Sequence, residues 1–325
     1  MDYVAAVAEW LAAPGEPEPW VVETSGSTGT PKRVRLPRRA VLASVEATAR
    51  RLGGSGRWSL RLPPEHVAGF QVVVRSLVAG AAPVRDGWGD ASYTSLVPTQ
   101  LVRLLDDPAE ADALRRMDAV LLGGGPVDPA LRARAEAAGI RVVATYGSAE
   151  TCGGCVYDGL PLDGVAVAIG EAGRVRIGGP TLFEGYDGDP ALTAEVLVDG
   201  WFLTSDSGRL DEDGRLQVLG RLDDVVVSGG VNVPGGVVAA RLRAHPGVRG
   251  AEVVGVPDDE WGQRVVAFVV TGGGTGLSLG EARAWVAAEH PRSWAPRELV
   301  VLDALPLLAN GKVDRMALRE RAVRA

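Results

Sequence analysis

The stretch that decides the fold of this sequence is Thr24-Ser25-Gly26-Ser27-Thr28-Gly29-Thr30-Pro31-Lys32. Its nine residues hold five hydroxyls, two glycines and one lysine; an apolar run at residues 19–22 predicts a strand before it, and a second short run, residues 33–36, follows it. Glycines let the backbone turn where a side chain would block it. Backbone N–H groups in such a turn form an anion-binding concavity, and hydroxyls and an ammonium add donors. The stretch predicts a loop for the triphosphate of a nucleotide, with a solvated hairpin turn as an equal alternative on the loop alone.

Composition bounds the class of protein. The 325 residues are enough for two domains, and the net charge of −7 does not indicate a protein that binds nucleic acid. Two cysteines, Cys152 and Cys155, exclude a disulfide framework, and with only three histidines a structural zinc site is not expected. Residues 1–13 predict an amphipathic helix rather than a signal peptide, and the most apolar stretch, residues 72–84, is too short to span a bilayer. We therefore expect a cytoplasmic protein that binds small molecules, without a membrane span or a nucleic-acid partner.

The order of elements predicts the fold class. Helices are expected at residues 37–53, 69–79 and 128–138, and strands at residues 58–62, 82–85, 93–97, 118–122 and 140–146. This alternation favours an α/β layered domain with a largely parallel sheet. Between residues 164 and 219, short apolar runs separated by Gly and Asp turns predict hairpins of a small β subdomain. A polar turn at residues 220–224 then predicts a boundary, which gives an N-terminal domain over residues 1–220 and a small α+β domain over residues 221–325.

Further segments follow the loop in a fixed order. They are Gly123-Gly124-Gly125-Pro126; Ala144-Thr145-Tyr146-Gly147-Ser148-Ala149-Glu150-Thr151; Trp201-Phe202-Leu203-Thr204-Ser205-Asp206-Ser207-Gly208; Gly220-Arg221-Leu222-Asp223-Asp224 with Ser228-Gly229-Gly230; and Leu305-Pro306-Leu307-Leu308-Ala309-Asn310-Gly311-Lys312-Val313-Asp314-Arg315. Each segment alone is a weak signal, whereas their order and spacing together are specific. From about residue 24 to residue 315 the chain resembles the adenylate-forming superfamily of acyl-CoA synthetases, luciferases and peptide-synthetase adenylation domains.

The resemblance implies a nucleotide site for ATP and Mg²⁺. The ATP phosphates would lie on the first loop, through Thr24, Ser25, Gly26, Ser27, Thr28, Gly29 and Lys32. The adenine would lie against Gly123, Gly124, Gly125 and Pro126, with Tyr146 stacked on its face and Gly147 beside it. Glu150 would hold Mg²⁺, which prefers oxygen ligands and substrate phosphates. Asp206 would accept the ribose hydroxyls, with Arg221 as a nearby donor.

The resemblance also implies a reaction in two steps. Attack of a carboxylate on the α-phosphate of ATP gives an acyl-adenylate and pyrophosphate, and the thiol of coenzyme A then displaces AMP. Lys312 would bridge the carboxylate and the α-phosphate, where it stabilises the shifting charge. The mobile C-terminal domain would swing about Asp223, so that the loop of Ser228, Gly229 and Gly230 replaces Lys312 in the second step.

One segment narrows the choice of acid. His66-Val67-Ala68-Gly69-Phe70-Gln71-Val72-Val73-Val74-Arg75 resembles the o-succinylbenzoate–CoA ligases of menaquinone synthesis. That substrate has a second carboxylate, for which Arg75 is a suitable partner; the alternatives are an arginine that extends to solvent or pairs with a protein acid. His66 would cap the acyl site or form a turn hydrogen bond. Ser148, Thr151 and Gly153 would line the acyl pocket.

Some positions depart from the superfamily pattern. Only residues 1–23 precede the phosphate loop, so we expect part of the acyl-side scaffold to be missing or supplied by a homodimer partner. Ala149 stands where a threonine is common, and Gly236 and Val238 stand where glutamates are common. The alternatives to an o-succinylbenzoate ligase are a ligase for another aryl or acyl acid, an adenylation enzyme that loads a carrier protein, and a non-catalytic nucleotide-binding protein.

Overall fold

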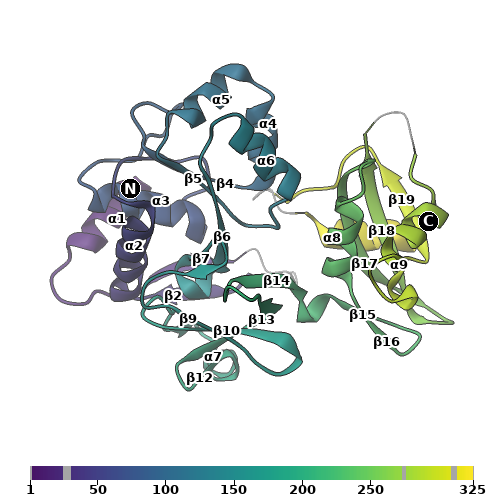
Figure 1. Cartoon of the computed structure of the whole chain (residues 1–325). Coiled ribbons are helices and arrows are strands. Elements are labelled where there is room, and N and C mark those ends of the chain that lie inside the picture. Colours follow the sequence, from purple (N-terminus) through teal and green to yellow (C-terminus); the bar gives the residue numbers. More distant parts are fainter. Residues whose placement is uncertain (1, 25–30, 273–275, 309–312, 325) are drawn as a thin grey trace. The chain divides into compact units, whose positions relative to one another are not determined.

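The computed structural model describes residues 2–24, 31–272, 276–308 and 313–324 (Figure 1). They form two compact units. The first comprises Met1–Ile169, Arg176–Thr204 and Leu210–Leu216, and the second comprises Gly170–Val175, Ser205–Arg209 and Gln217–Ala325. The division expected between residues 220 and 221 stays a prediction. Within the described ranges, every helix falls short of the length and apolar character that a bilayer crossing requires.

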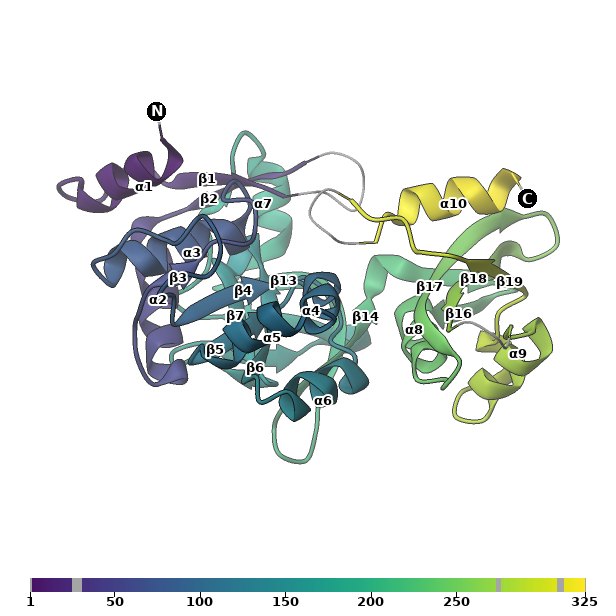
Figure 2. The same ribbon diagram turned by 90° about the horizontal axis from the view of Figure 1, so that it is seen from above.

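A six-stranded sheet is the centre of the first unit (Figure 2). Its strands in spatial order are β3 (Trp58–Ser59), β4 (Tyr93–Leu96), β5 (Ala119–Leu122), β6 (Val142–Ser148), β7 (Gly153–Tyr157) and β8 (Leu160–Pro161). Strands β3 to β6 run parallel, and β7 and β8 add antiparallel pairs. The α/β layered domain with a largely parallel sheet is thereby confirmed.

Helices cover both faces of this sheet. They are α2 (Arg38–Leu52) and α3 (Val67–Val78) on one face, and α4 (Pro98–Leu105), α5 (Pro108–Arg115) and α6 (Pro129–Ala137) on the other. Alternate residues of a strand point to opposite faces. In β5, Ala119 and Leu121 accordingly join the core under α2 and α3, whereas Val120 and Leu122 join the core under the other three helices. Burial on both faces explains the continuous apolar run of this strand.

A three-stranded antiparallel sheet carries the phosphate loop. Its strands are β1 (Trp20–Glu23), β2 (Arg33–Leu36) and β11 (Gly185–Tyr186), with β2 in the middle. Helix α1 (Tyr3–Ala12), which the sequence predicts, packs against the same core. The rings of Trp20 and Phe70 stack at 5.6 Å, so aromatic contacts join β1 to α3.

A sheet of short strands follows. It contains β9 (Ala166–Ile169), β10 (Arg174–Gly178), β12 (Leu197–Val198), β13 (Trp201–Leu210) and β14 (Leu216–Arg221), in the order β12-β13-β10-β9 with β14 beside β13. The predicted β subdomain is therefore confirmed. Helix α7 (Pro190–Val196) was not predicted from the sequence. Its N-cap is Asp189, whose side chain accepts a hydrogen bond from the N–H of Leu192.

The second unit contains an α+β module, as expected. Its elements are β15 (Val225–Ser228), β16 (Val231–Pro234), α8 (Gly235–Arg243), β17 (Val248–Asp258), β18 (Gly262–Thr271), α9 (Leu279–Ala287), β19 (Glu298–Leu302) and α10 (Arg315–Arg324). Strands β17 and β18 form a long antiparallel hairpin, and β19 runs parallel to β18. Alternate residues of β17 again separate into two cores, with Val253 in one and Val254 in the other.

Two predicted strands are much shorter than expected. Residues 58–62 contribute only Trp58–Ser59, and residues 82–85 contribute a single bridge between Ser59 and Val84. Proline cannot donate to a sheet ladder. Pro83 therefore has no N–H group for the ladder, and the contact is limited to Val84, which donates to the carbonyl of Trp58 at 2.9 Å and accepts from the N–H of Leu60 at 2.8 Å.

Both cysteines are free and buried. Cys152 and Cys155 have no exposed surface. Burial raises the pKa of Cys155 to about 12 and also raises that of Cys152. The two side chains are packing residues rather than reactive thiols.

Candidate active site

The two ends of the predicted phosphate loop, Thr24 and Lys32, adjoin the strands β1 and β2. The backbone N–H of Thr24 donates to the carbonyl of Lys32 at 2.9 Å, and the N–H of Lys32 donates to Oγ1 of Thr24 at 3.2 Å. These two bonds join the two ends of the predicted loop, and the roles of Thr24 and Lys32 at the phosphates stay a prediction. The predicted residues Ser25, Gly26, Ser27, Thr28 and Gly29 lie outside the described residues.

Glu150 is a buried carboxylate beside this hairpin. It lies in a 3-10 turn, Ala149–Thr151, between β6 and β7, and its side chain is 7% exposed. The hydroxyl of Tyr186 donates to Oε1 of Glu150 at 2.7 Å. Burial, and then the neighbouring carboxylate, raise the pKa of the Tyr186 phenol above its ordinary value, so the phenol stays a donor.

The donor set at Glu150 fits a magnesium ion held mainly by a nucleotide. No cationic side chain of the described ranges forms an ion pair with this carboxylate. The same ranges contain no group of three or more His, Cys, Asp or Glu that could form a metal site by itself. Magnesium is often bound through one or two carboxylates together with substrate phosphates, which is the arrangement that a single buried glutamate allows.

The predicted adenine-binding segments lie at the carboxyl ends of neighbouring strands in the central sheet. Strands β5 and β6 are parallel neighbours, so Gly123 after β5 and Tyr146 near the end of β6 lie at the carboxyl edge where ligands of open α/β sheets bind. A Cβ on Gly123 would lie 2.5 Å from Oγ1 of Thr145, and Gly124 has a φ of 80°. Gly124 and Gly125 form a bend, and Pro126 follows it outside helix and strand.

Gly147 permits a close crossing of β6 and β7. A Cβ at this position would lie 2.1 Å from the carbonyl oxygen of Gly153. The register shifts between Tyr146 and Gly147, which produces a bulge next to the predicted stacking tyrosine. The backbone itself therefore requires glycine at position 147, and Gly153 has a φ of 93°, which glycine adopts readily.

The predicted acyl-side residues lie on α3 and around the turn that holds Glu150. His66 is the N-cap of α3, and its Nδ1 lies 3.3 Å from the carbonyl oxygen of Glu23 at the end of β1. The ring therefore bonds across to the strand that precedes the phosphate loop. Oγ1 of Thr151 accepts from the N–H of Ser148 at 2.9 Å, while Oγ of Ser148 is buried without a hydrogen-bond partner.

Arg75 is buried inside the first unit. Its side chain is 5% exposed, its Nη2 donates to hydroxyls of Thr48 and Tyr157 at 3.3 Å each, and its guanidinium lies 5.0 Å from the ring centre of Trp58. Within the described part of the chain no acid pairs with it, and its Nε has no hydrogen-bond partner. Neither alternative, an arginine at the surface or one paired with a protein acid, matches this environment.

Gln71 is a buried polar residue that the sequence analysis did not single out. Its Nε2 donates to the carbonyl of Cys152 at 2.7 Å, and its Oε1 is buried without a partner. A Cβ on Gly153 would lie 3.4 Å from Cγ of Gln71. A glutamine on an apolar helix, one turn before Arg75, was the available signal.

Several predicted residues belong to the second unit. Asp206 in β13 and Arg221 at the end of β14 approach each other to 4.0 Å. Asp223 lies in a 3-10 turn, Leu222–Asp224, and its role as a hinge stays a prediction. The catalytic lysine of the resemblance, Lys312, lies outside the described residues.

The predicted turn between β15 and β16 contacts Trp261. Oγ of Ser228 accepts from Nε of Arg297 at 3.5 Å. The N–H of Gly229 donates to the carbonyl of Trp261 at 2.9 Å, and a Cβ on Gly229 would lie 2.7 Å from the indole ring. Gly230 has a φ of 76°, which glycine adopts readily.

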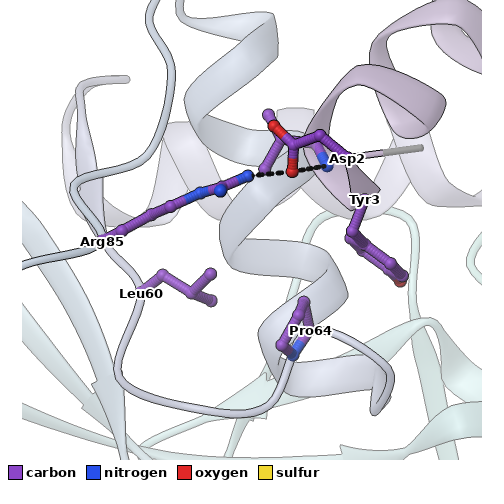
Figure 3. Close-up of a pocket in the computed structure, with 6 residues that line it drawn as sticks. Asp2, Tyr3, Leu60, Pro64 and Arg85 are labelled. Atoms are coloured by element: carbon purple, nitrogen blue, oxygen red, sulfur yellow. Dashed lines mark hydrogen bonds and ion pairs between the residues drawn. The ribbon is translucent and has the colours of Figure 1, made fainter.

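A shallow pocket of about 260 Å³ lies elsewhere in the first unit (Figure 3). Asp2, Tyr3, Leu60, Pro64 and Arg85 line it, and Arg85 forms an ion pair with Asp2 across its rim. None of the predicted site residues is part of its lining.

Comparison with known proteins gives consistent results. The family model described as AMP-binding enzyme matches residues 21–187, and the model described as AMP-binding enzyme C-terminal domain matches residues 238–312. A probable 2-succinylbenzoate–CoA ligase of Mycobacterium tuberculosis is 47% identical over 93% of this chain and 84% of its own length. The 2-succinylbenzoate–CoA ligase of Geobacillus kaustophilus is 33% identical over 92% of this chain and 68% of its own length.

Two solved structures are also similar. The o-succinylbenzoate CoA synthetase of Bacillus subtilis, in complex with its acyl-adenylate intermediate, superposes with a TM-score of 0.78 at 28% identity, covering 94% of this chain and 69% of that one. The ATP-bound protein MatB of Rhodopseudomonas palustris superposes with a TM-score of 0.83 at 25% identity, covering 93% of this chain and 67% of that one.

Proposed function

Because this chain belongs to the AMP-binding enzyme family, we propose that it is a 2-succinylbenzoate–CoA ligase of the AMP-forming type. It activates the acid with ATP, releases pyrophosphate, and transfers the acyl group to coenzyme A with release of AMP. The observation that carries this proposal is the 47% identity to a probable ligase of this kind over 93% of the chain. The product would serve menaquinone synthesis.

The nucleotide roles of the described residues support the first step. Thr24 and Lys32 hold the ends of the phosphate loop together, and Gly123 and Tyr146 offer a backbone edge and an aromatic face for the adenine. Asp206 supplies a carboxylate for the ribose hydroxyls. Lys312, assigned through the family motif, would stabilise charge on the α-phosphate as the carboxylate attacks.

Glu150 is proposed as the protein ligand of Mg²⁺. Its burial and its lack of a described cationic partner leave a negative charge that a bound cation would neutralise. When bound, the ion would offset the charge of the nucleotide phosphates. Glu150 also stays in one orientation because its Oε1 accepts from Tyr186.

Arg75 is proposed to bind the second carboxylate of the substrate. A buried guanidinium without a described counter-ion favours a bound anion, and its Nε has an unused N–H group. His66, Ser148, Thr151 and Gly153 would border the activated end of the acid. The unpartnered Oγ of Ser148 supports this placement.

The proposal includes three further parts. The C-terminal domain would turn about Asp223 between the two steps, with Ser228, Gly229 and Gly230 reaching the site for thiolation. The enzyme would act in the cytoplasm. A homodimer is the proposed assembly, and sedimentation would give its mass directly.

A pyrophosphate-release assay tests the proposed function. The enzyme is incubated with ATP and Mg²⁺ and with o-succinylbenzoate, benzoate, succinate or a fatty acid, each with and without coenzyme A. We expect release with o-succinylbenzoate to exceed the others, and the acyl-CoA to form only when the thiol is present. Equal release with monocarboxylates would contradict the role of Arg75, and no release with any acid would contradict the ligase assignment.

A lysine variant separates an enzyme from a nucleotide-binding protein. Lys312→Ala should lose adenylation and still bind ATP, because the lysine acts on the reacting groups rather than on the whole nucleotide. An unchanged rate would contradict the assigned role. Titration of ATP by calorimetry supplies the binding measurement.

A further inference from the structure

Tyr186 connects three parts of the first unit that are far apart in sequence. It lies on β11, where it pairs with Val34 of β2, the strand that leaves the phosphate loop. Its hydroxyl donates to Glu150 at 2.7 Å, and its side chain is 6% exposed. The N–H of Phe183, just before this strand, donates to the backbone carbonyl of Glu150 at 2.9 Å. The turn that carries Glu150 is therefore held against the hairpin by both a side-chain and a backbone bond.

The Glu150 carboxylate depends on this phenol. Among the described residues, no other side chain donates a hydrogen bond to it and none forms an ion pair with it. Hydrogen bonds from a neutral donor to a buried carboxylate are strong, because the acceptor is charged and the surroundings are apolar. Loss of this bond would leave Glu150 free to rotate and poorly solvated.

Lys32 contacts the same tyrosine. Its Nζ lies 5.2 Å from the centre of the Tyr186 ring, within the range of a cation–π contact. Lys32 is the last residue of the predicted phosphate loop. Tyr186 therefore contacts both the carboxylate proposed for Mg²⁺ and a cation at the end of that loop.

We propose that Tyr186 is a positioning residue for adenylation: its hydroxyl orients Glu150 toward Mg²⁺. This inference rests on the proposed function, because the nucleotide and the ion are those of the ligase reaction. The tyrosine should therefore affect how the reaction depends on Mg²⁺, and not how the enzyme binds the acid or coenzyme A.

The test is Tyr186→Phe, which removes the hydroxyl and keeps the ring. Pyrophosphate release is measured over a range of Mg²⁺ concentrations, and binding of ATP is measured by calorimetry with Mg²⁺ and with a chelator. We expect the half-saturating Mg²⁺ concentration to rise about tenfold, the size of one hydrogen bond to a charged group. Activity should recover at high Mg²⁺, and ATP binding in the chelator should stay as in the wild type.

Two matched variants complete the experiment. Tyr93→Phe removes the hydroxyl of another buried tyrosine, whose partner is the carbonyl of Gly54, and should leave the Mg²⁺ dependence unchanged. Glu150→Gln by itself should raise the half-saturating Mg²⁺ concentration. Addition of Tyr186→Phe to that variant should then have little further effect, because the tyrosine acts through the carboxylate. Fully additive effects would overturn the inference.

The outcomes distinguish this inference from the proposed function. A Tyr186→Phe enzyme with a lowered thermal midpoint and an unchanged Mg²⁺ dependence would show a structural role only and would refute the inference. If the wild type releases no pyrophosphate with any acid, the ligase proposal fails. The calorimetric comparison still tests Tyr186 in that case, and equal Mg²⁺-dependent ATP binding by the wild type and the variant would refute its role.

Discussion

Replacement of Arg75 by methionine should leave the fold stable while it removes selectivity for a dicarboxylate. The variant loses two hydrogen bonds of 3.3 Å, about 1 kcal/mol each, and a cation–π contact of about 2 kcal/mol. It also removes a buried charge that no described acid balances, and burial of such an ion costs several kcal/mol. Thr48 and Tyr157 remain bonded to each other at 3.1 Å, so neither hydroxyl is left alone. We expect a free energy of unfolding within about 2 kcal/mol of the wild type.

The effect on catalysis should be much larger. A substrate carboxylate without its buried partner would cost about 2–4 kcal/mol, or about 30- to 1,000-fold in kcat/KM for o-succinylbenzoate. Monocarboxylates should lose little, so the ratio of the two kcat/KM values reports the role of Arg75. Urea unfolding gives the free energy of unfolding, and the pyrophosphate assay on the same preparations gives the ratio of the two kcat/KM values.

Arg51 provides the matched control for this experiment. It donates to the backbone carbonyls of Tyr157, Leu160 and Pro161, and not to the Tyr157 hydroxyl that Arg75 contacts. Arg51→Met should therefore reduce the free energy of unfolding and leave the ratio of kcat/KM for o-succinylbenzoate to that for a monocarboxylate unchanged. If Arg75→Met instead loses more than about 3 kcal/mol of stability and keeps the ratio of the wild type, Arg75 is a structural residue and the reasoning is wrong.

Three further predictions concern single positions. Gly69→Ala should lose at least about 2 kcal/mol of stability, because a Cβ there would lie 2.1 Å from the carbonyl oxygen of Pro63. Gly280→Ala in α9, where a Cβ has open space, should gain about 1 kcal/mol. Urea midpoints that shift in the same direction in both variants would contradict this prediction. Burial raises the pKa of Glu252 above its ordinary 4.5, so the native state binds more protons and the stability that this group contributes is lost as pH rises through the raised value. Glu252→Gln should remove that loss, as unfolding at pH 5 and pH 8 would show, and an unchanged pH dependence would refute it. Arg315→Ala should reduce stability, since Arg315 pairs with both Asp224 and Glu252, and an unaltered midpoint would count against these ion pairs.

The sequence predicted the layered fold because its signals are local. Apolar runs such as residues 119–122 are buried on both faces, and glycines mark the turns after them. The β subdomain and the elements of the second unit were recognisable for the same reason. Strand lengths were less predictable, since Pro83 acts on pairing between segments rather than within one segment.

The contacts of the site could not be predicted in the same way. Arg75 was visible as a charge in an apolar helix, but its neighbours Trp58 and Tyr157 come from strands 17 and 82 residues away. Tyr186 lies on a two-residue strand, which is too short for a periodic pattern, and its partner Glu150 is 36 residues earlier. Such contacts follow from tertiary packing, which no local pattern records.

The two buried thiols make this protein well suited to site-specific labelling. Because Cys152 and Cys155 are inaccessible and stay protonated, maleimide reagents should leave the native wild-type chain unmodified. Leu42→Cys in the first unit and Val301→Cys in the second, at positions 37% and 50% exposed, would then carry a fluorescent pair without removal of any natural cysteine. Energy transfer between the dyes during turnover would follow the C-terminal domain in solution, in an otherwise unaltered enzyme.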